Sequence, residues 1–355
     1  MPRLLIAASG TGGHIFPAIA VAEALPKSWE ISWLGVSDRL ESELVPDKYR
    51  ITKVRLAGLQ TNKWKRVFQF FNVLISIWVV IRLIKSENIH LVFTTGGYIA
   101  APAIIGAKLC GVKVILHESN AFPGKVTRLL GKFCNLVALG LPPAKEYLKK
   151  SRTVFTGTPV RKAFLVVQVL PDWVPVGAGP LIIVMGGSQG AIGLNQMVGN
   201  VIPTLLNEGC RIVHLTGNKA HREVDHKNFV ARSFSKDIAA LFQHADLVIS
   251  RAGAGTLCEL SLCGAPAILV PYPYAADRHQ DFNASYAAEC GAALIVSQHD
   301  PNKNILGDAL KRLLKSRFDS VDDASDFLAK MSRNMKMIAI RDSEKKLVEI
   351  ITHFH

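Results

Sequence analysis

One pattern, a strand followed by a glycine-rich loop and a helix, limits the possible folds of this chain more than any other feature. It runs through residues 3–25, and the same order returns in residues 181–206. The two loops, residues 9–14 and 186–191, have related compositions and each follows a short apolar run. Such units build parallel α/β domains. The repeat therefore predicts two similar Rossmann-like α/β domains whose parallel sheets face each other across a cleft.

The length of 355 residues suits two domains, and a hydrophobic content of 49% supplies two cores. A Pro- and Gly-rich passage with few core residues runs from 157 to 180 and marks the boundary. We expect an N-terminal domain at 1–160 and a C-terminal domain at 161–343. A last helix, within 344–355, is expected to pack back on the first domain.

The six cysteines show no C-x-x-C pair and no metal-ligand spacing, so the sequence predicts buried thiols of a reducing compartment and no metal site. The N-terminus leads directly into a strand, without the pattern of a signal peptide. Both features indicate a cytosolic location.

The formal net charge is +14, and its distribution is uneven. The first 160 residues hold 21 of the 42 Lys and Arg residues but only 9 of the 28 Asp and Glu residues. An anionic partner should therefore meet the first half of the chain. Nucleic acid and an anionic membrane surface both fit this charge.

A basic and aromatic helix, predicted within residues 62–85, favours the membrane. Its apolar run of about fifteen residues is shorter than the roughly twenty needed to span a bilayer. An ordinary crossover helix packed on a sheet would explain most of its apolar residues. However, the large side chains exceed what one sheet face requires, and basic residues lie at both ends. This composition suits a helix that dips an aromatic face into an anionic membrane interface. The expected contact residues are Trp64, Phe68, Phe71, Ile75 and Trp78.

The first glycine loop resembles a dinucleotide-binding fingerprint but lacks its third glycine, because Ile15 occupies that position. The loop still allows a ligand to approach the backbone closely. His14 stands at the helix start, where an imidazole can simply end a helix without a partner. It can equally act as a general base near neutral pH, and the local pattern does not separate the two interpretations.

Residues 249–283 contain the densest set of candidate ligand-binding groups. A buried strand ends at a glycine turn, and a helix is predicted from Thr256 to about Cys263. Glu259 has two interpretations. Thr256 and Glu259 fit the T-x-x-E spacing of a capping box, in which Glu259 would satisfy the first N–H groups of the helix. A carboxylate in the first helical turn can also accept hydrogen bonds from a ribose diol. The polar residues 277–283 lie beyond the next strand, where sugar hydroxyls would find hydrogen-bonding partners.

Polar residues also follow strands of the first domain, at 95–98 and 117–124. The carboxyl ends of parallel strands meet at one edge of a sheet, so these groups should lie near His14. In the second domain, Ser188 and the N–H groups of its loop are expected to form an anion site. A tight turn without a ligand is the alternative, but the loop has more glycine than a turn needs.

Taken together, these motifs resemble the MurG family of bacterial peptidoglycan glycosyltransferases over essentially the whole chain. The motifs are SGTGGH at 9–14, TGGY at 95–98, HESN at 117–120, GTPVR at 157–161, GGSQGA at 186–191 and the block 251–283. The resemblance implies a GT-B fold. It implies transfer of N-acetylglucosamine from UDP-N-acetylglucosamine to the muramyl C4 hydroxyl of undecaprenyl-pyrophosphoryl-MurNAc-pentapeptide (lipid I), giving lipid II, without a cofactor. The implied location is peripheral, at the cytoplasmic face of the cell (inner) membrane.

The resemblance also assigns roles to individual residues. Glu259 would hold the ribose diol, Ser188 and Arg161 the diphosphate, and the backbone near Ser235 the uracil. His14 is implied as the base. The further nucleotide-binding residues are Ala254, Gly255, Thr256, Leu257 and Cys258, and those that face the sugars are Gly10, Thr11, Gly12, Gly13, Asn120, His279 and Gln280. Two positions depart from the family pattern: His279 and Ser119 stand where other members have glutamine.

The expected mechanism is a single inverting displacement without a metal ion. A UDP-sugar epimerase of the same fold is the nearest alternative, but it would not need the basic aromatic helix. A nucleic-acid-binding protein is suggested by charge alone and has no recognition motif here, so no nucleic-acid partner is expected. The incomplete fingerprint disfavours an NAD-dependent enzyme.

Overall fold

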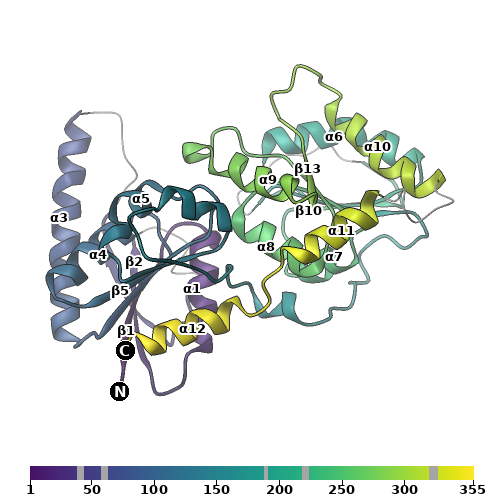
Figure 1. Ribbon diagram of the computed structural model, residues 1–355. Coiled ribbons are helices and arrows are strands. Elements are labelled where there is room, and N and C mark those ends of the chain that lie inside the picture. The colour runs from purple at the N-terminus through teal and green to yellow at the C-terminus, as the bar shows by residue number, and fades with distance from the viewer. Residues whose placement is uncertain (38–43, 57–62, 188–190, 218–223, 320–326) are drawn as a thin grey trace. The chain divides into compact units, whose positions relative to one another are not determined.

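The computed structural model describes residues 1–37, 44–56, 63–187, 191–217, 224–319 and 327–355, with side chains except at 63–68 and 315–319. The chain divides into two compact units, one formed by Met1–Arg161 with Asp342–His355 and the other by Lys162–Arg341. Both cores are open parallel sheets with helices on their faces (Figure 1). The sequence-based boundaries, at 160 and 343, differ from these by one and two residues.

The N-terminal unit has a seven-stranded sheet in the order β3-β2-β1-β4-β5-β6-β7, and all of its strand pairs are parallel. Its elements are β1 (Arg3–Ala7), α1 (Gly12–Ala24), β2 (Glu30–Val36), β3 (Arg50–Val54), α3 (Lys63–Ser86), β4 (Leu91–Thr94), α4 (Ala100–Leu109), β5 (Lys113–Glu118), α5 (Lys125–Leu130), β6 (Leu136–Leu139), β7 (Thr153–Phe155) and α12 (Ser343–His353), with short 3-10 helices at Gly131–Phe133 and Pro142–Tyr147.

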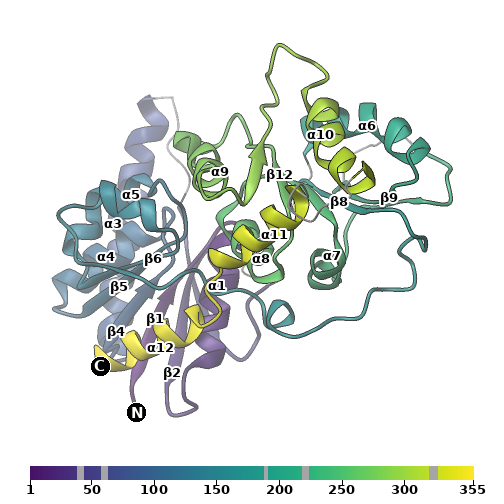
Figure 2. The same cartoon turned by 45° about the vertical axis from the view of Figure 1, so that its right-hand side comes forward.

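Both faces of this sheet are buried. Leu5 and Ala7 of β1 point into the core formed with α3 and α4, whereas Leu4 and Ile6 point into the core formed with α1 and α12. Because both sides are covered, the strands are continuous apolar runs and not alternating ones. Figure 2 shows α12, in yellow, lying along this unit beside α1, with Leu347 and Ile351 wholly buried.

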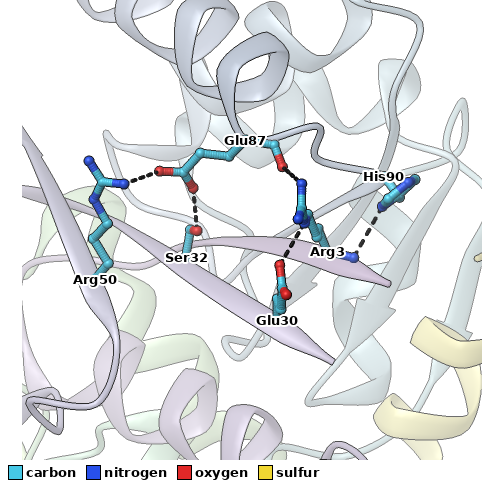
Figure 3. Close-up of polar contacts among 6 residues, drawn as sticks. All are labelled: Arg3, Glu30, Ser32, Arg50, Glu87 and His90. Atoms are coloured by element: carbon cyan, nitrogen blue, oxygen red, sulfur yellow. Dashed lines mark hydrogen bonds and ion pairs between the residues drawn. The ribbon is translucent and has the colours of Figure 1, made fainter. Parts of the chain in front are cut away.

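The helix α3 is attached tightly to this unit. Val80 packs against Gly106 of α4, where a Cβ would come within 2.6 Å of the valine side chain. The residue after α3, Glu87, accepts a short hydrogen bond from Ser32 Oγ and pairs with Arg50 at 3.2 Å, and its carbonyl accepts a hydrogen bond from Arg3 Nη1 (Figure 3). The end of α3 is therefore fixed to β1, β2 and β3.

The C-terminal unit has a six-stranded sheet in the order β10-β9-β8-β11-β12-β13, also with parallel pairs only. The core of one face includes residues of α6, α10 and α11. Its elements are β8 (Leu181–Met185), α6 (Ile192–Asn207), β9 (Arg211–Leu215), β10 (Phe229–Arg232), α7 (Ile238–His244), β11 (Leu247–Ser250), α8 (Ala254–Cys263), β12 (Ala267–Leu269), α9 (His279–Glu289), β13 (Ala293–Ile295), α10 (Ile305–Asp319) and α11 (Phe327–Met337), with 3-10 helices at Lys162–Leu165 and Ala276–Arg278.

Candidate active site

Each sheet has one point at which the order of its strands reverses. β1 lies between β2 and β4, and β8 lies between β9 and β11. In open parallel sheets, ligands bind at such a point, beyond the carboxyl ends of the strands. The two glycine-rich loops selected from the sequence follow β1 and β8, and therefore lie at these two points.

The loop after β1 places the start of α1 next to the strand end. It turns at Gly10, whose φ of +106° glycine adopts without strain. Thr11 is extended and forms the N-cap of α1, and its carbonyl accepts the N–H groups of His14 (3.0 Å) and Ile15 (3.2 Å). The first N–H groups of α1, which begins at Gly12, lack intrahelical acceptors. This helix end therefore suits an anionic or strongly polar ligand.

His14 has a defined tautomer. Its Nδ1 lies 2.6 Å from the carbonyl oxygen of Thr95, which follows β4. A carbonyl only accepts hydrogen bonds, so Nδ1 carries a proton, and in the neutral imidazole Nε2 then has the lone pair. Nε2 lies against Gly97, where a Cβ would be 3.8 Å away. Gly96 and Gly97 both have positive φ, and the second glycine turn therefore makes room for the imidazole. Nε2 is therefore the ring nitrogen of His14 that can accept a proton.

A second histidine, His117 at the end of β5, is a neutral structural group. Its side chain is fully buried, with Nε2 3.0 Å from the carbonyl oxygen of Gly157 and Nδ1 3.4 Å from Ser119 Oγ. Burial lowers the pKa of His117 to about 4, so its ring is uncharged at neutral pH. Nε2 therefore donates to Gly157, and His117 ties the end of β5 to the segment that leads to Arg161.

Glu118 organises the loop that contains Asn120. The buried carboxylate accepts hydrogen bonds from Asn120 N and Nδ2 (both 3.1 Å), from Gly124 N (3.0 Å) and from Thr127 Oγ1 (2.7 Å). These contacts hold the Asn120 side chain in one orientation at the strand end. Sequence reasoning did not select Glu118. Its position at the end of the buried run of β5 was the available signal, since a buried carboxylate at a strand end needs several donors there.

Arg161 is the last residue of the first segment of the N-terminal unit. Its guanidinium lies 5.3 Å from the centroid of the Phe16 ring in α1. This stacking keeps the cation close to the first turns of α1, the element that also carries His14.

In the C-terminal unit, the loop after β8 begins with Gly186 and Gly187. Gly186 packs against Ala191, where a Cβ would approach the alanine side chain to 2.6 Å, and Gly187 has a φ of +98°. The predicted diphosphate ligand Ser188 lies outside the described residues. The helix that follows, α6, begins at Ile192 with Ala191 as its N-cap.

The structure contradicts the capping-box interpretation of Glu259. Helix α8 begins at Ala254 and not at Thr256, because Gly253 is extended (φ −68°, ψ 139°) and forms the N-cap. Glu259 therefore lies in the second turn, where the T-x-x-E spacing caps nothing. The predicted end of the helix is correct, since Gly264 closes it in the left-handed conformation. The ribose interpretation of Glu259 stays a prediction.

The predicted polar loop after β12 is partly helical, because α9 starts at His279. Gln280 Oε1 accepts the N–H of Tyr272 (2.9 Å), which leaves the Nε2 donors of Gln280 for a ligand. The two residues before α9, Asp277 and Arg278, both have positive φ (50° and 54°). Left-handed backbone at non-glycine residues is costly and concentrates at functional sites.

Ser235 lies in the segment between β10 and α7. Its Oγ accepts a hydrogen bond from the backbone N–H of Asp237 (3.0 Å) and donates one to the Asp237 carboxylate (3.1 Å). The hydroxyl thus shapes the turn, and the contact of its backbone with uracil stays a prediction. Within the described ranges, no group of three or more His, Cys, Asp or Glu residues is placed to hold a metal ion.

Within each unit, most of the predicted substrate-binding residues that the structure describes therefore follow the carboxyl ends of parallel strands. Comparison with known proteins gives this arrangement its context. Residues 4–139 match the glycosyltransferase family 28 N-terminal domain, and residues 181–338 match the family 28 C-terminal domain. A Prochlorococcus marinus protein named UDP-N-acetylglucosamine–N-acetylmuramyl-(pentapeptide) pyrophosphoryl-undecaprenol N-acetylglucosamine transferase is 57% identical over 356 residues, covering 100% of both chains. The chain belongs to the MurG family.

Solved structures agree with this assignment. The crystal structure of MurG from Acinetobacter baumannii is 26% identical, has a TM-score of 0.80, and covers 99% of this chain and 100% of its own. The GT-B fold that the sequence predicted is thus confirmed for this member of the MurG family. A UDP-N-acetylglucosamine 2-epimerase from Listeria monocytogenes also matches, with a TM-score of 0.67 at 15% identity, over 99% of this chain and 96% of its own. At that identity only the fold is shared, so the fold does not distinguish a transferase from an epimerase, whereas the MurG sequence relationship does.

Proposed function

We propose that the protein transfers N-acetylglucosamine from UDP-N-acetylglucosamine to the C4 hydroxyl of undecaprenyl-pyrophosphoryl-MurNAc-pentapeptide. The family relationship supplies the two substrates. The observation that carries the chemistry is the hydrogen bond from His14 Nδ1 to Thr95 O, because it leaves Nε2 as a free base beside the glycine loop. The N-terminal unit receives the acceptor, and the C-terminal unit binds the donor.

The reaction is one inverting displacement. The C4 oxygen of the muramyl sugar attacks the anomeric carbon of N-acetylglucosamine, while the bond from that carbon to the β-phosphate oxygen breaks. UDP leaves with the bonding electrons, and the hydroxyl proton passes to His14 Nε2. Asn120, held by Glu118, and the loop from Gly10 to Gly13 orient the sugars. Electrostatic stabilisation of the departing diphosphate comes from helix N–H groups, Arg161 and Ser188.

The donor nucleotide is held by α8 and the loops around it. Glu259 accepts both hydroxyls of the ribose, and residues 254–258 line the nucleotide. The backbone at Ser235 faces the uracil, and Gln280, together with His279, contacts the hydroxyls of the transferred sugar. The start of α8 at Ala254 supports this assignment, since it releases Glu259 from a capping role.

Replacing Glu259 by alanine is expected to raise KM for UDP-N-acetylglucosamine by about 10–100-fold, because two hydrogen bonds to a charged acceptor are lost. Steady-state assays with the 2′-deoxyribose analogue of the donor test the assignment directly. The wild type should discriminate against the analogue, and the variant should not. Glu289→Ala, an exposed carboxylate at the end of α9, is the matched control. Equal discrimination by wild type and Glu259→Ala would remove Glu259 from the ribose site.

The exposed face of α3 supports contact with a membrane. Phe71, Ile75 and Trp78 are 56%, 59% and 57% exposed, and Phe70 on the same side is 63% exposed. The guanidinium of Arg82 lies 5.5 Å from the Trp78 ring, which places a cation at the edge of the apolar face. The side chains of Trp64 and Phe68, predicted to belong to this face, lie outside the described residues.

By length and composition alone, Gln69–Ser86 of α3 could cross a membrane, with a mean hydropathy of 1.4 over 18 residues, and this window is longer than the apolar run expected from sequence. However, Val80, Leu83 and Ile84 on its other side are buried in the core of the N-terminal unit. A helix with one face in a protein core and an aromatic, basic face outside suits the membrane interface. We therefore place the protein peripherally at the cytoplasmic face of the cell (inner) membrane, with anionic lipid and not nucleic acid as its surface partner.

UDP release from UDP-N-acetylglucosamine, measured with and without a short-chain lipid I analogue, tests the proposed function. Release should depend on the acceptor and should be accompanied by a disaccharide product with a β-1,4 linkage. Acceptor-independent formation of an epimerised sugar or of UDP would instead identify an epimerase or a hydrolase. The measurement distinguishes these outcomes because only the transferase couples loss of UDP to the acceptor.

A further inference from the structure

A buried arginine joins three strand ends of the C-terminal unit. Arg251, directly after β11, is 7% exposed. Its Nη1 donates to the carbonyls of Val270 (3.1 Å) and Pro271 (3.2 Å) after β12, and its Nη2 donates to Gln298 Oε1 (2.6 Å) after β13. Its Nε is buried without a hydrogen-bond partner among the described residues. Neither Arg251 nor Gln298 is among the residues of the donor site proposed above.

The arginine determines which way the amide of Gln298 points. A guanidinium has only donors, so the atom of Gln298 that it contacts at 2.6 Å must be the oxygen. The amide nitrogen is therefore directed away from Arg251. It makes no hydrogen bond to the part of the chain that the structure describes, and both of its N–H groups remain available.

The amide nitrogen of Gln298 lies against the first turn of α6. A Cβ built on Gly193, the second residue of that helix, would come within 2.4 Å of Gln298 Nε2 and 2.5 Å of Oε1. No side chain larger than hydrogen fits there unless Gln298 moves. The Nε2 donors of Gln298 therefore lie against the first turn of α6, whose first N–H groups lack intrahelical acceptors.

The electrostatics of this cluster are unusual for a buried arginine. Its usual partner is a carboxylate, which offsets the cost of removing the charge from water. Among the described residues, the side chain that accepts a hydrogen bond from Arg251 is a neutral amide, and no carboxylate pairs with it. A positive charge and the positive end of α6 therefore share one region, which an anion would stabilise.

We propose that Gln298 is a donor-binding residue whose Nε2 contacts the diphosphate of the sugar nucleotide, and that Arg251 is the positioning residue that holds this amide in orientation. The proposal rests on the proposed function, because it takes UDP-N-acetylglucosamine as the ligand. A diphosphate ligand explains why the partner of Arg251 is an amide. A carboxylate in the same place would neutralise the charge of the arginine, and its oxygen atoms would repel the anionic ligand.

The binding of UDP and of uridine to the wild type and to Gln298→Glu, measured by isothermal titration calorimetry, tests this proposal. Glutamate fits the same space and can pair with Arg251, so the melting temperature of the variant should be equal or higher. Its affinity for UDP should fall by about 10–100-fold, since donors to a charged group become repelling acceptors. Its affinity for uridine, which has no phosphate, should change less than about threefold. Gln243→Glu, a glutamine of α7 that binds backbone groups of residues 166 and 168, is the matched control and should change neither affinity.

A second variant keeps the test decisive if Gln298→Glu fails to fold. Gly193→Ala adds no charge but displaces the amide of Gln298, and it should also weaken UDP binding more than uridine binding. The proposal is overturned if both ligands lose affinity equally, which would indicate a purely structural role, or if UDP affinity is unchanged. A wild type that binds uridine and UDP equally would instead overturn the diphosphate site, whereas a wild type that binds neither would overturn the proposed function itself.

Discussion

Replacing His14 by alanine is expected to lower kcat for acceptor-dependent UDP release by about 10²–10⁴-fold, the usual contribution of a positioned general base. KM for UDP-N-acetylglucosamine should change little, because the proposed donor site lies in the C-terminal unit. The reason lies in the tautomer: Nδ1–H is committed to Thr95 O at 2.6 Å, so Nε2 is the nitrogen that can accept the C4 hydroxyl proton. Steady-state kinetics with a short-chain lipid I analogue measure both parameters.

His244→Ala is a suitable control for the loss of one imidazole. His244 ends α7 in the other unit, is exposed and contacts the Gln168 carbonyl at 2.9 Å, and no substrate contact is assigned to it. Its removal should leave kcat within about twofold, as expected for a surface change away from the site. If His14→Ala retained the wild-type kcat, the base would have to be another group, and the contact between His14 and Thr95 would be only structural.

The fold could be predicted because its determinants are local. Each glycine loop follows an apolar strand and precedes an apolar helix within about twenty-five residues, and such a unit builds a parallel sheet in only one common way. The apolar strands predict burial on both sides, as Leu4 and Leu5 show by pointing into different cores. The MurG family relationship then confirmed the GT-B fold.

The errors arose where a local pattern has two structural solutions. Thr256 and Glu259 have the spacing of a capping box, but the spacing does not define where the helix begins. Gly253 has no side chain to mark it as an N-cap, and the helix starts two residues earlier than predicted.

Gln298, which sequence reasoning missed, is oriented by a distant partner. Arg251, 47 residues earlier, contacts its amide oxygen, whereas the four donors that converge on Glu118 come from the nine residues that follow it. The contact of His14 with Thr95 spans 81 residues. No periodicity or motif encodes such pairs, since each depends on which strand ends the sheet order brings together. The sequence therefore indicated the loops of the site, while the orientation of their side chains required the structure.

Replacing Phe71, Ile75 and Trp78 together by serine is expected to abolish most binding to vesicles that contain anionic phospholipid. Full burial of one large apolar side chain contributes about 1.5–3 kcal/mol. These three side chains are each a little more than half exposed in the free protein, so their transfer to the interface should together contribute about 3–5 kcal/mol. The loss corresponds to a fall in membrane partitioning of about 10²–10³-fold or more, which flotation with liposomes can measure.

The triple variant also separates membrane binding from catalysis. Its kcat with a soluble short-chain acceptor should equal that of the wild type, because the exposed face of α3 is distinct from the His14 loop, whereas turnover of an acceptor embedded in vesicles should fall with the partitioning. Serine replacements of Val167, Val169 and Val176, which are 94%, 89% and 90% exposed in the C-terminal unit, remove apolar surface elsewhere and should leave flotation unchanged. Undiminished flotation of the α3 variant would show that basic residues alone attract the protein to lipid. High salt would then release the wild type completely, whereas an inserted aromatic face retains part of its binding when charges are screened.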